Sequence, residues 1–183
     1  QDTHETLNTF TWGPDGWLYG CQGVFTHSNV GRPGATDKER TRINAGVWRY
    51  HPTRKVFELF AEGSSNPWGV DFDRYGNAFV SACVIDHLFH MAPGGQYARQ
   101  SGSPADPYGY ELLKSIVEHK HHMAAYGGIQ VYQGDQFPPE WRGEVFMGNI
   151  HQNALNHDHL TPNGSSFKAT ADKDFLTTTD GWF

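Results

Sequence analysis

Histidine is the side chain in this sequence with the greatest capacity for chemistry. The 183 residues include 11 histidines in a chain of formal charge −6, and an imidazole both titrates near neutral pH and binds metals. His157 and His159 lie two residues apart, so on a strand they share one face. Two groups could hold Zn, Cu, Fe or Ni, or could be solvated or hydrogen-bonded side chains, because no His-Glu-x-x-His or paired-cysteine motif accompanies them. The groups are His119, His121 and His122, and His151, His157 and His159.

The composition excludes several classes of protein. Lys and Arg number 14 against 20 Asp and Glu, so a nucleic-acid partner is not expected. No apolar run approaches the roughly 20 residues of a membrane span, so no transmembrane segment is expected in this chain. Aromatic residues make up 14%, with 21 Gly and 10 Pro, which favours many turns and an all-β fold over a disordered or helical one. Cys21 and Cys83 form either one bridge or two buried free thiols, and no Cys-x-x-Cys-His haem site is present.

Short strands of alternating polarity recur along the chain, each pair joined by a glycine turn. The first hairpins join 9–12 to 17–20 across Gly13-Pro14-Asp15-Gly16, 70–72 to 77–80 across Asp73-Arg74-Tyr75-Gly76, and 129–132 to 143–147. A second hairpin follows each one, with turns at 51–54, at 93–95 and at 162–164. The repeating unit is therefore predicted to be four strands in two hairpins.

Four-stranded units in series predict a β-propeller. Three blades fill this chain, at about 6–62, about 68–100 and about 128–171, and we expect residues 1–183 to be part of a six-bladed ring. An open stack of three blades or a sandwich is the alternative. The long loop at about 101–127 is predicted to contain a short helix within 110–119, because Leu112, Leu113, Ile116 and Val117 share one helical face.

Motifs spread over nearly the whole chain carry a family resemblance. They are residues 2–8 with 10–20, 66–73, 126–135, 141–151, 174–176 and 180–183. Through them the chain resembles the membrane-bound dehydrogenase domain of planctomycete-type bacteria. That family resembles, more weakly, the soluble quinoprotein glucose and sorbosone dehydrogenases, which are six-bladed propellers that use pyrroloquinoline quinone (PQQ) with calcium.

The resemblance implies roles for particular residues. His4 matches a general base that takes the proton of a sugar hydroxyl, a task that suits an imidazole. Asn66, Trp68 and the run Tyr126, Gly127 and Gly128 match loops that surround the cofactor. Asp86 follows the second blade's inner strand, where these quinoproteins bind calcium, and carboxylate oxygen is a ligand that calcium prefers.

One departure from the family pattern concerns the cofactor. Ser65 stands where the quinoproteins carry an Arg that contacts PQQ, and a hydroxyl cannot replace the bidentate fork of a guanidinium. The resemblance nevertheless implies an oxidoreductase that oxidises a sugar or other alcohol, works in the periplasm or at the cell surface, and passes electrons to a haem-bearing acceptor outside this chain. The alternative is a non-catalytic propeller that binds carbohydrate or a partner protein through its loop-covered face.

Overall fold

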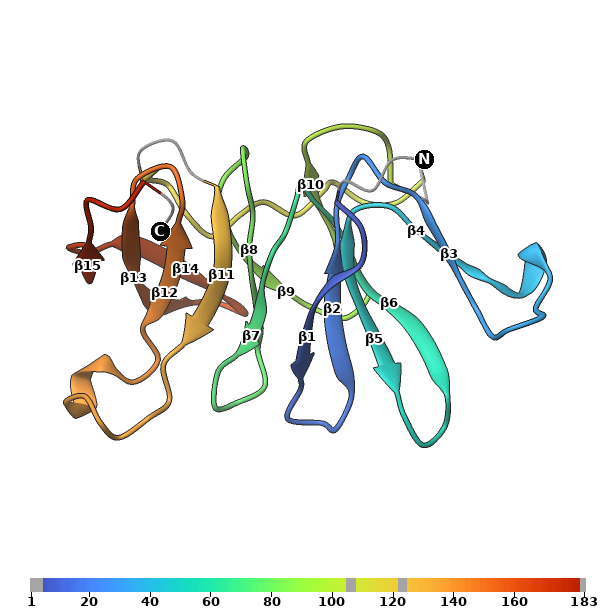
Figure 1. Ribbon diagram of the computed structural model, residues 1–183, viewed down its shortest axis with the longest axis horizontal. Coiled ribbons are helices and arrows are strands. Elements are labelled where there is room, and N and C mark those ends of the chain that lie inside the picture. Colours follow the sequence, from blue (N-terminus) through green and yellow to red (C-terminus); the bar gives the residue numbers. More distant parts are fainter. Residues whose placement is uncertain (1–4, 105–107, 122–124, 182–183) are drawn as a thin grey trace.

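The computed structural model describes residues 5–104, 108–121 and 125–181. In this part of the chain, three main β-sheets stand side by side and fan around one side of the molecule, and a two-stranded arm projects from the first of them (Figure 1). Helical structure in the described residues is confined to two short 3-10 turns, η1 (Asp37–Glu39) and η2 (Pro139–Trp141). The prediction of an all-β, propeller-type fold is confirmed.

The first sheet is built from two antiparallel hairpins. At the first turn, Asp15 Oδ1 accepts a hydrogen bond from the Trp17 N–H at 3.2 Å, and Gly16 takes φ +80°, which glycine adopts without a steric penalty. The strand order is β1-β2-β5-β6-β10, and β3 and β4 form the arm. The bounds are β1 Asn8–Trp12, β2 Leu18–Gln22, β3 Ser28–Val30, β4 Thr41–Ile43, β5 Gly46–His51, β6 Val56–Ser64 and β10 Gln96–Arg99.

The second sheet has three strands, β7 (Val70–Phe72), β8 (Ala78–Ser81) and β9 (Leu88–Met91). The second hairpin predicted for this sheet does not form, because among the described residues β9 has no antiparallel partner after the turn at 93–95. After the turn at 93–95 the chain enters β10, which pairs in parallel with β6 of the first sheet instead of returning along β9. This crossing strand ties the first two sheets together. The blade boundaries predicted from the repeat stay predictions.

The third sheet follows the predicted hairpins closely. Its strand order is β11-β12-β13-β14, with β15 pairing on β13. The turn at 162–164 joins β13 to β14, as the sequence predicted. The bounds are β11 Tyr126–Val131, β12 Val145–Asn149, β13 Ala154–Asn163, β14 Ser166–Ala171 and β15 Leu176–Thr177.

The helix predicted within 110–119 is wrong. These residues run as an extended strap, defined here as residues 108–121, that pairs in turn with β10 of the first sheet, with Leu88 of the second and with Ala169 of the third. Leu113 forms an isolated parallel bridge with Tyr97, and Val117 forms one with Ala169. The Ile116 N–H donates to the Leu88 carbonyl at 3.0 Å. Backbone pairing with strands on both sides therefore replaces the internal hydrogen bonds of a helix.

The core fills the two spaces between neighbouring sheets. Strand β8 shows why, because all four of its residues are buried. Val80 packs in the cluster with the first sheet, whereas Phe79 packs in the cluster with the third sheet. Successive side chains on a strand point to opposite faces. Strand β8 therefore contributes side chains to the core on each of its two sides, one shared with the first sheet and one with the third.

The strand directions define two ends of the fan. The turns at 13–16, 51–54 and 73–76 lie at the lower end in Figure 1. The opposite end, called the upper end from here on, holds the starts of β7 and β11, the 82–87 loop and the 150–153 turn. The residues predicted to bind a cofactor belong to this end.

Candidate functional site at the upper end

The loops before β7 and at the start of β11 meet closely at the upper end. A Cβ placed on Gly69 would lie 2.8 Å from the backbone nitrogen of Ile129 and 3.1 Å from the carbonyl carbon of Gly128. Only a glycine at position 69 lets the two backbones approach this closely. The structure therefore brings together the motif that contains Asn66 and Trp68 and the motif that contains Tyr126.

The predicted cofactor residues differ in accessibility. Trp68 is 43% exposed, whereas Tyr126 is 1% exposed. The side-chain oxygen of Asn66 is buried and has no hydrogen-bond partner among the described residues, and the same is true of the Tyr126 hydroxyl. Gly127 is exposed beside them. His4 lies outside the described residues, so its role as a base stays a prediction.

The predicted calcium ligand Asp86 belongs to the 82–87 loop, which contacts Tyr126 through Cys83, whose Sγ lies 3.7 Å from the Tyr126 carbonyl oxygen. The Asp86 carboxylate is about half exposed, and the nearest cation is the Lys120 ammonium at 3.9 Å. Ser65, the departure from the family pattern, is fully buried and donates its hydroxyl hydrogen bond to Gln100. Neither Asp86 nor Ser65 can therefore replace the positive charge of the arginine that the quinoproteins carry at the position of Ser65.

Three histidines converge on one buried carboxylate just inside the upper end. Asp158 Oδ2 lies 2.9 Å from His87 Nε2, and Oδ1 lies 3.1 Å from His119 Nε2 and 2.7 Å from His121 Nε2. Asp158 is 0% exposed and comes from β13, His87 immediately precedes β9, and the other two histidines come from the strap. We call these four residues the His-Asp cluster.

The electrostatics of the His-Asp cluster favour an ionised carboxylate. Burial by itself would raise the pKa of Asp158, but hydrogen bonds from His121 and His87 outweigh burial and lower it well below its usual range. Burial lowers the pKa of His87. Tyr126, whose ring centre lies 5.4 Å from that of His87, has its pKa raised by burial and by the negative charge of Asp158.

A second histidine group lies on the outer part of the third sheet. Glu144 accepts from His157 Nε2 at 2.9 Å and from His159 Nδ1 at 2.5 Å. The prediction that these two histidines share a face is confirmed. The His157 ring packs nearly parallel to the rings of Trp141, at 5.2 Å, and Phe146, at 4.8 Å. His151 is exposed in the 150–153 turn and does not join them.

The sequence prediction of the His-Asp cluster was partial. It named His119 and His121 as a potential metal group, and the structure brings both to one carboxylate. His122 lies outside the described residues. His87 and Asp158 were missed as ligands because they lie 71 residues apart in the chain. The one available signal was the position of His87 at the end of the loop in which the metal ligand Asp86 was predicted.

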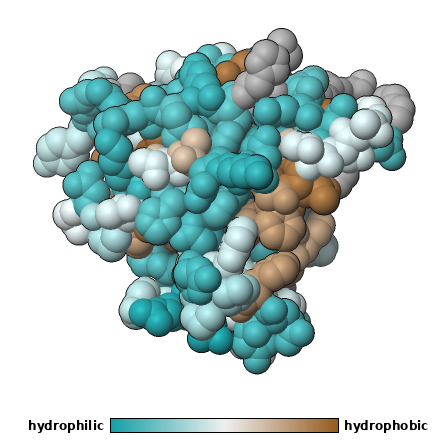
Figure 2. Space-filling view, turned by 90° about the vertical axis from the view of Figure 1, so that its left-hand side faces the viewer, coloured by the Kyte–Doolittle hydropathy of each residue, from teal (hydrophilic) through white to brown (hydrophobic). Residues whose placement is uncertain are grey.

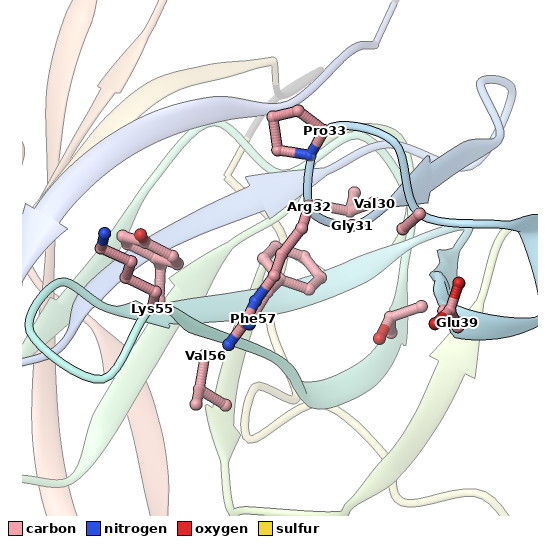
Figure 3. A pocket seen from close by; sticks show the side chains of 11 residues that line it. Val30, Gly31, Arg32, Pro33, Glu39, Lys55, Val56 and Phe57 are labelled. Atoms are coloured by element: carbon pink, nitrogen blue, oxygen red, sulfur yellow. The ribbon is translucent and has the colours of Figure 1, made fainter.

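Among the cavities that lie away from the His-Asp cluster, two border the arm and the apolar part of the third sheet. A cavity of about 840 Å³ lies between the arm and the β5–β6 hairpin, and it is lined among others by Arg32 and Pro33 from the arm and by Lys55 and Phe57 from the hairpin (Figure 3). An apolar cavity of about 380 Å³ lies on the third sheet, lined among others by Phe137 and Phe146. Figure 2, which faces the side that bears this sheet, shows a mostly hydrophilic surface with a hydrophobic strip along one edge.

Comparison with solved structures defines the class of fold. An oxidoreductase described as a glucose dehydrogenase, from Thermus thermophilus, superposes with a TM-score of 0.63 at 19% identity, covering 92% of this chain and 51% of that one. The PQQ-bound aldose sugar dehydrogenase of Streptomyces coelicolor gives 0.60 at 18% identity, covering 92% and 50%. The soluble aldose sugar dehydrogenase of Escherichia coli, in its apo form, gives 0.59 at 18% identity, covering 96% and 57%. The chain thus has the fold of about half of each of these propeller-type dehydrogenases.

The family follows from the sequence itself. Residues 1–183 match the family model described as "Domain of unknown function (DUF7133)", and the chain belongs to this family. No curated protein matches the sequence. None of the helices in the described residues is long and apolar enough to span a membrane.

Proposed function

We propose that this chain is a substrate-oxidising domain of a quinoprotein-like oxidoreductase that acts on a sugar or another alcohol at the upper end. The observation that carries the proposal is the fold, which the chain shares over 92% of its length with the PQQ-bound aldose sugar dehydrogenase. The close approach of Gly69 to Gly128 supports it further, because two motifs of the family resemblance then lie side by side.

Oxidation of an alcohol sets the chemical requirements of the site. The carbon that bears the hydroxyl gives up a hydride to an acceptor, and the hydroxyl gives up a proton to a base. His4 is the proposed base. Asn66 lies in the same loop as Trp68, and its side-chain oxygen is buried without a hydrogen-bond partner among the described residues. Trp68 offers a partly exposed aromatic face on which a sugar ring could stack.

The charges that the described residues bring to this end fit PQQ poorly, since the exposed Lys120 ammonium already lies 3.9 Å from the Asp86 carboxylate. That cofactor carries three carboxylates, which call for fixed positive charge nearby. Arg99 lies opposite Ser64 in the pairing of β10 with β6, next to Ser65. Its guanidinium is ion-paired with Glu62 at 3.2 Å and also donates to Asn44 at 2.6 Å, so its charge is already neutralised. Asp86 alone is also far short of the six to eight oxygen ligands that calcium takes.

The remaining parts of the proposal come from the family resemblance. Electrons would leave to a haem-bearing acceptor outside this chain, and the protein would work in the periplasm or at the cell surface. The chain spans about half the length of the dehydrogenases it resembles, so substrate range and acceptor belong to the protein as a whole.

The test is dye reduction by the purified full-length protein with a panel of aldoses and simple alcohols, measured both with the cofactor that the protein retains and after addition of PQQ and calcium. We expect substrate-dependent reduction that falls by about 100-fold or more in His4→Ala. A matched control is His51→Ala, which removes the histidine at the lower end of β5. Absence of any reduction, or equal rates in His4→Ala and the wild type, would refute the proposed function.

A non-catalytic role is the second candidate, and one observation favours it. The Arg99–Glu62 ion pair neutralises the cation that a carboxylate-bearing cofactor would need beside Ser65, whereas a neutral carbohydrate needs none. A glycan array, followed by calorimetric titration of Trp68→Ala, distinguishes the two candidates. Binding of a sugar that depends on Trp68, without turnover in the dye-reduction assay, would establish the binding role.

A further inference from the structure

We propose that His87, His119, His121 and Asp158 form a binding site for a divalent first-row transition metal, of which zinc fits best. The site borders the loops assigned to the proposed function, because Tyr126 packs on His87, but the proposal does not depend on the oxidoreductase function. It rests on the geometry of the four ligand atoms, on their chemistry and on a neighbouring buried hydroxyl.

The four side chains already present their ligand atoms to a common point. Each offers one atom, and these atoms all lie within 4.8 Å of one another. Neighbouring ligand atoms around a tetrahedral zinc with bonds of about 2.0–2.1 Å lie roughly 3.3 Å apart. The distances from Asp158 to the three imidazoles, 2.7 to 3.1 Å, are slightly shorter. Small outward movements of the side chains would therefore admit an ion.

The donor set selects the kind of metal. Three imidazole nitrogens suit Zn, Cu, Fe or Ni, whereas calcium and magnesium require mostly oxygen ligands. Three histidines and one carboxylate complete the four positions of a tetrahedral zinc site. One carboxylate charge against a divalent ion leaves a net charge of about +1, so Asp158 cancels half of the ion's charge in this buried place.

The Tyr126 hydroxyl is an independent sign that the cluster has room for a further group. This side chain is 1% exposed, its hydroxyl has no hydrogen-bond partner among the described residues, and its ring packs on His87 with centres 5.4 Å apart. Buried polar groups in folded proteins almost always have a partner. A water molecule enclosed beside the ion and its four ligands would supply one.

Access and connectivity also suit a metal site. The His119 side chain is 22% exposed, which provides a route for the ion, while Asp158 is fully buried. The four ligands come from the second sheet, from the strap and from the third sheet. A bound ion would therefore fix the strap between the two sheets, and its binding energy would add to folding stability.

The second histidine group supplies a matched control. Glu144, His157 and His159 also combine a carboxylate with two imidazoles. They offer two histidines instead of three, and they are not among the clusters of converging ligand atoms in the described residues. A variant at His159 thus changes a carboxylate-bound histidine without touching the proposed ligands.

The experiment uses the full-length protein stripped with a chelator and titrated with ZnCl₂ by calorimetry, then with CoCl₂ by visible absorption. We expect one Zn²⁺ per chain, a cobalt spectrum typical of four-coordinate sites, and a higher Tm with zinc. His119→Ala and His121→Ala should each weaken zinc binding by about 100-fold or more and abolish the rise in Tm. His159→Ala should bind zinc like the wild type.

Asp158→Asn is the strongest variant but sits in the core, so the two strap variants carry the test if it does not fold. Circular dichroism of the metal-free variants confirms that the fold is retained. Failure of the wild type to bind zinc at micromolar concentration would overturn the proposal. So would wild-type affinity in His121→Ala, or a loss of binding in His159→Ala that equals the loss in His121→Ala.

Discussion

Asp71 of the second sheet accepts a hydrogen bond from the backbone N–H of Val131 in the third sheet, with 2.7 Å between Oδ2 and N. A side chain thereby joins two strands, β7 and β11, that belong to different sheets. Gln133 adds a second link by donating to the Phe72 carbonyl at 2.7 Å. These contacts hold neighbouring sheets of the fan in register where no ladder of backbone hydrogen bonds connects the described strands.

Replacing Asp71 should separate the effect of its hydrogen bond from the effect of its charge. Asp71→Ala leaves the Val131 N–H without an acceptor and should lower the free energy of unfolding by about 1–3 kcal/mol. Asp71→Asn keeps an acceptor and should lower it by less than about 1 kcal/mol at neutral pH. Urea unfolding followed by fluorescence measures both. Equal losses in the two variants would contradict the assignment.

The same carboxyl group predicts a pH dependence. Burial raises the pKa of Asp71 above its ordinary value of 3.8, so the folded state holds the proton at a pH where the unfolded state has lost it. Its contribution to stability is full below pH 3.8 and is lost as the pH rises through the folded-state pKa. The wild type should therefore gain stability relative to Asp71→Asn as the pH falls into the acidic range. A difference that stays constant with pH would contradict this.

Gly69→Ala should be destabilising because of the backbone contact at the upper end. Its Cβ would lie 2.8 Å from both Ile129 N and Ile129 Cγ2, and such overpacking costs about 1–3 kcal/mol. Gly148→Ala is the control, since nothing in the described residues lies within 4 Å of the position its Cβ would take. We expect urea midpoints that fall for the first variant and stay level or rise for the second. Equal midpoints would show that the two loops are not in contact.

His90 should contribute to acid sensitivity. Its ring packs on Phe79 and Phe167, and Nδ1 lies 3.0 Å from Ser166 Oγ. Burial lowers the pKa of His90 below its ordinary value of 6.5. The folded state therefore favours the neutral ring, and the associated stability is present above pH 6.5 and is lost as the pH falls toward the folded-state pKa.

The measurement compares the wild type with His90→Gln, which does not titrate. Unfolding free energies between about pH 7.5 and about pH 5 should fall more steeply for the wild type than for the variant. Parallel slopes would contradict the role of His90.

Both cysteines are free and buried, which decides between the two states predicted from the sequence. Burial raises the pKa of Cys21 to about 12 and also raises the pKa of Cys83. Thiolate is the reactive form, so a disulfide reagent such as DTNB should label neither thiol rapidly in the native protein and both after unfolding in urea. Rapid labelling of a native thiol, assigned with Cys21→Ser and Cys83→Ser, would contradict this burial.

Local patterns predicted most of the hairpins correctly. The turn that contains Gly76 can be recognised from the sequence because its stabilising contacts are local. Asp73, the first residue of the turn, accepts hydrogen bonds from the Tyr75 and Asn77 N–H groups, each at 2.9 Å. All of these contacts lie within four residues, so the sequence contains the information directly. The turn between β7 and β8 therefore could be predicted without knowledge of the fold.

The strap and the His-Asp cluster could not be predicted because their partners are distant in sequence. The spacing of Leu113, Ile116 and Val117 suits a helix, but Ile116 instead pairs with Leu88 on one side and Ala169 on the other. Tertiary hydrogen bonds here outweigh local preference. Likewise, no spacing rule connects His87 with Asp158 across two sheets.

The strand exchange made by β10 has a consequence for how the molecule can be divided. Because β10 leaves its own hairpin to line the edge of β6, cutting the chain after Ser64 would remove the partner of that edge and leave its backbone groups open to other chains. The first two sheets should therefore unfold as one cooperative unit, and a recombinant fragment meant to stay monomeric must keep Gln96–Arg99.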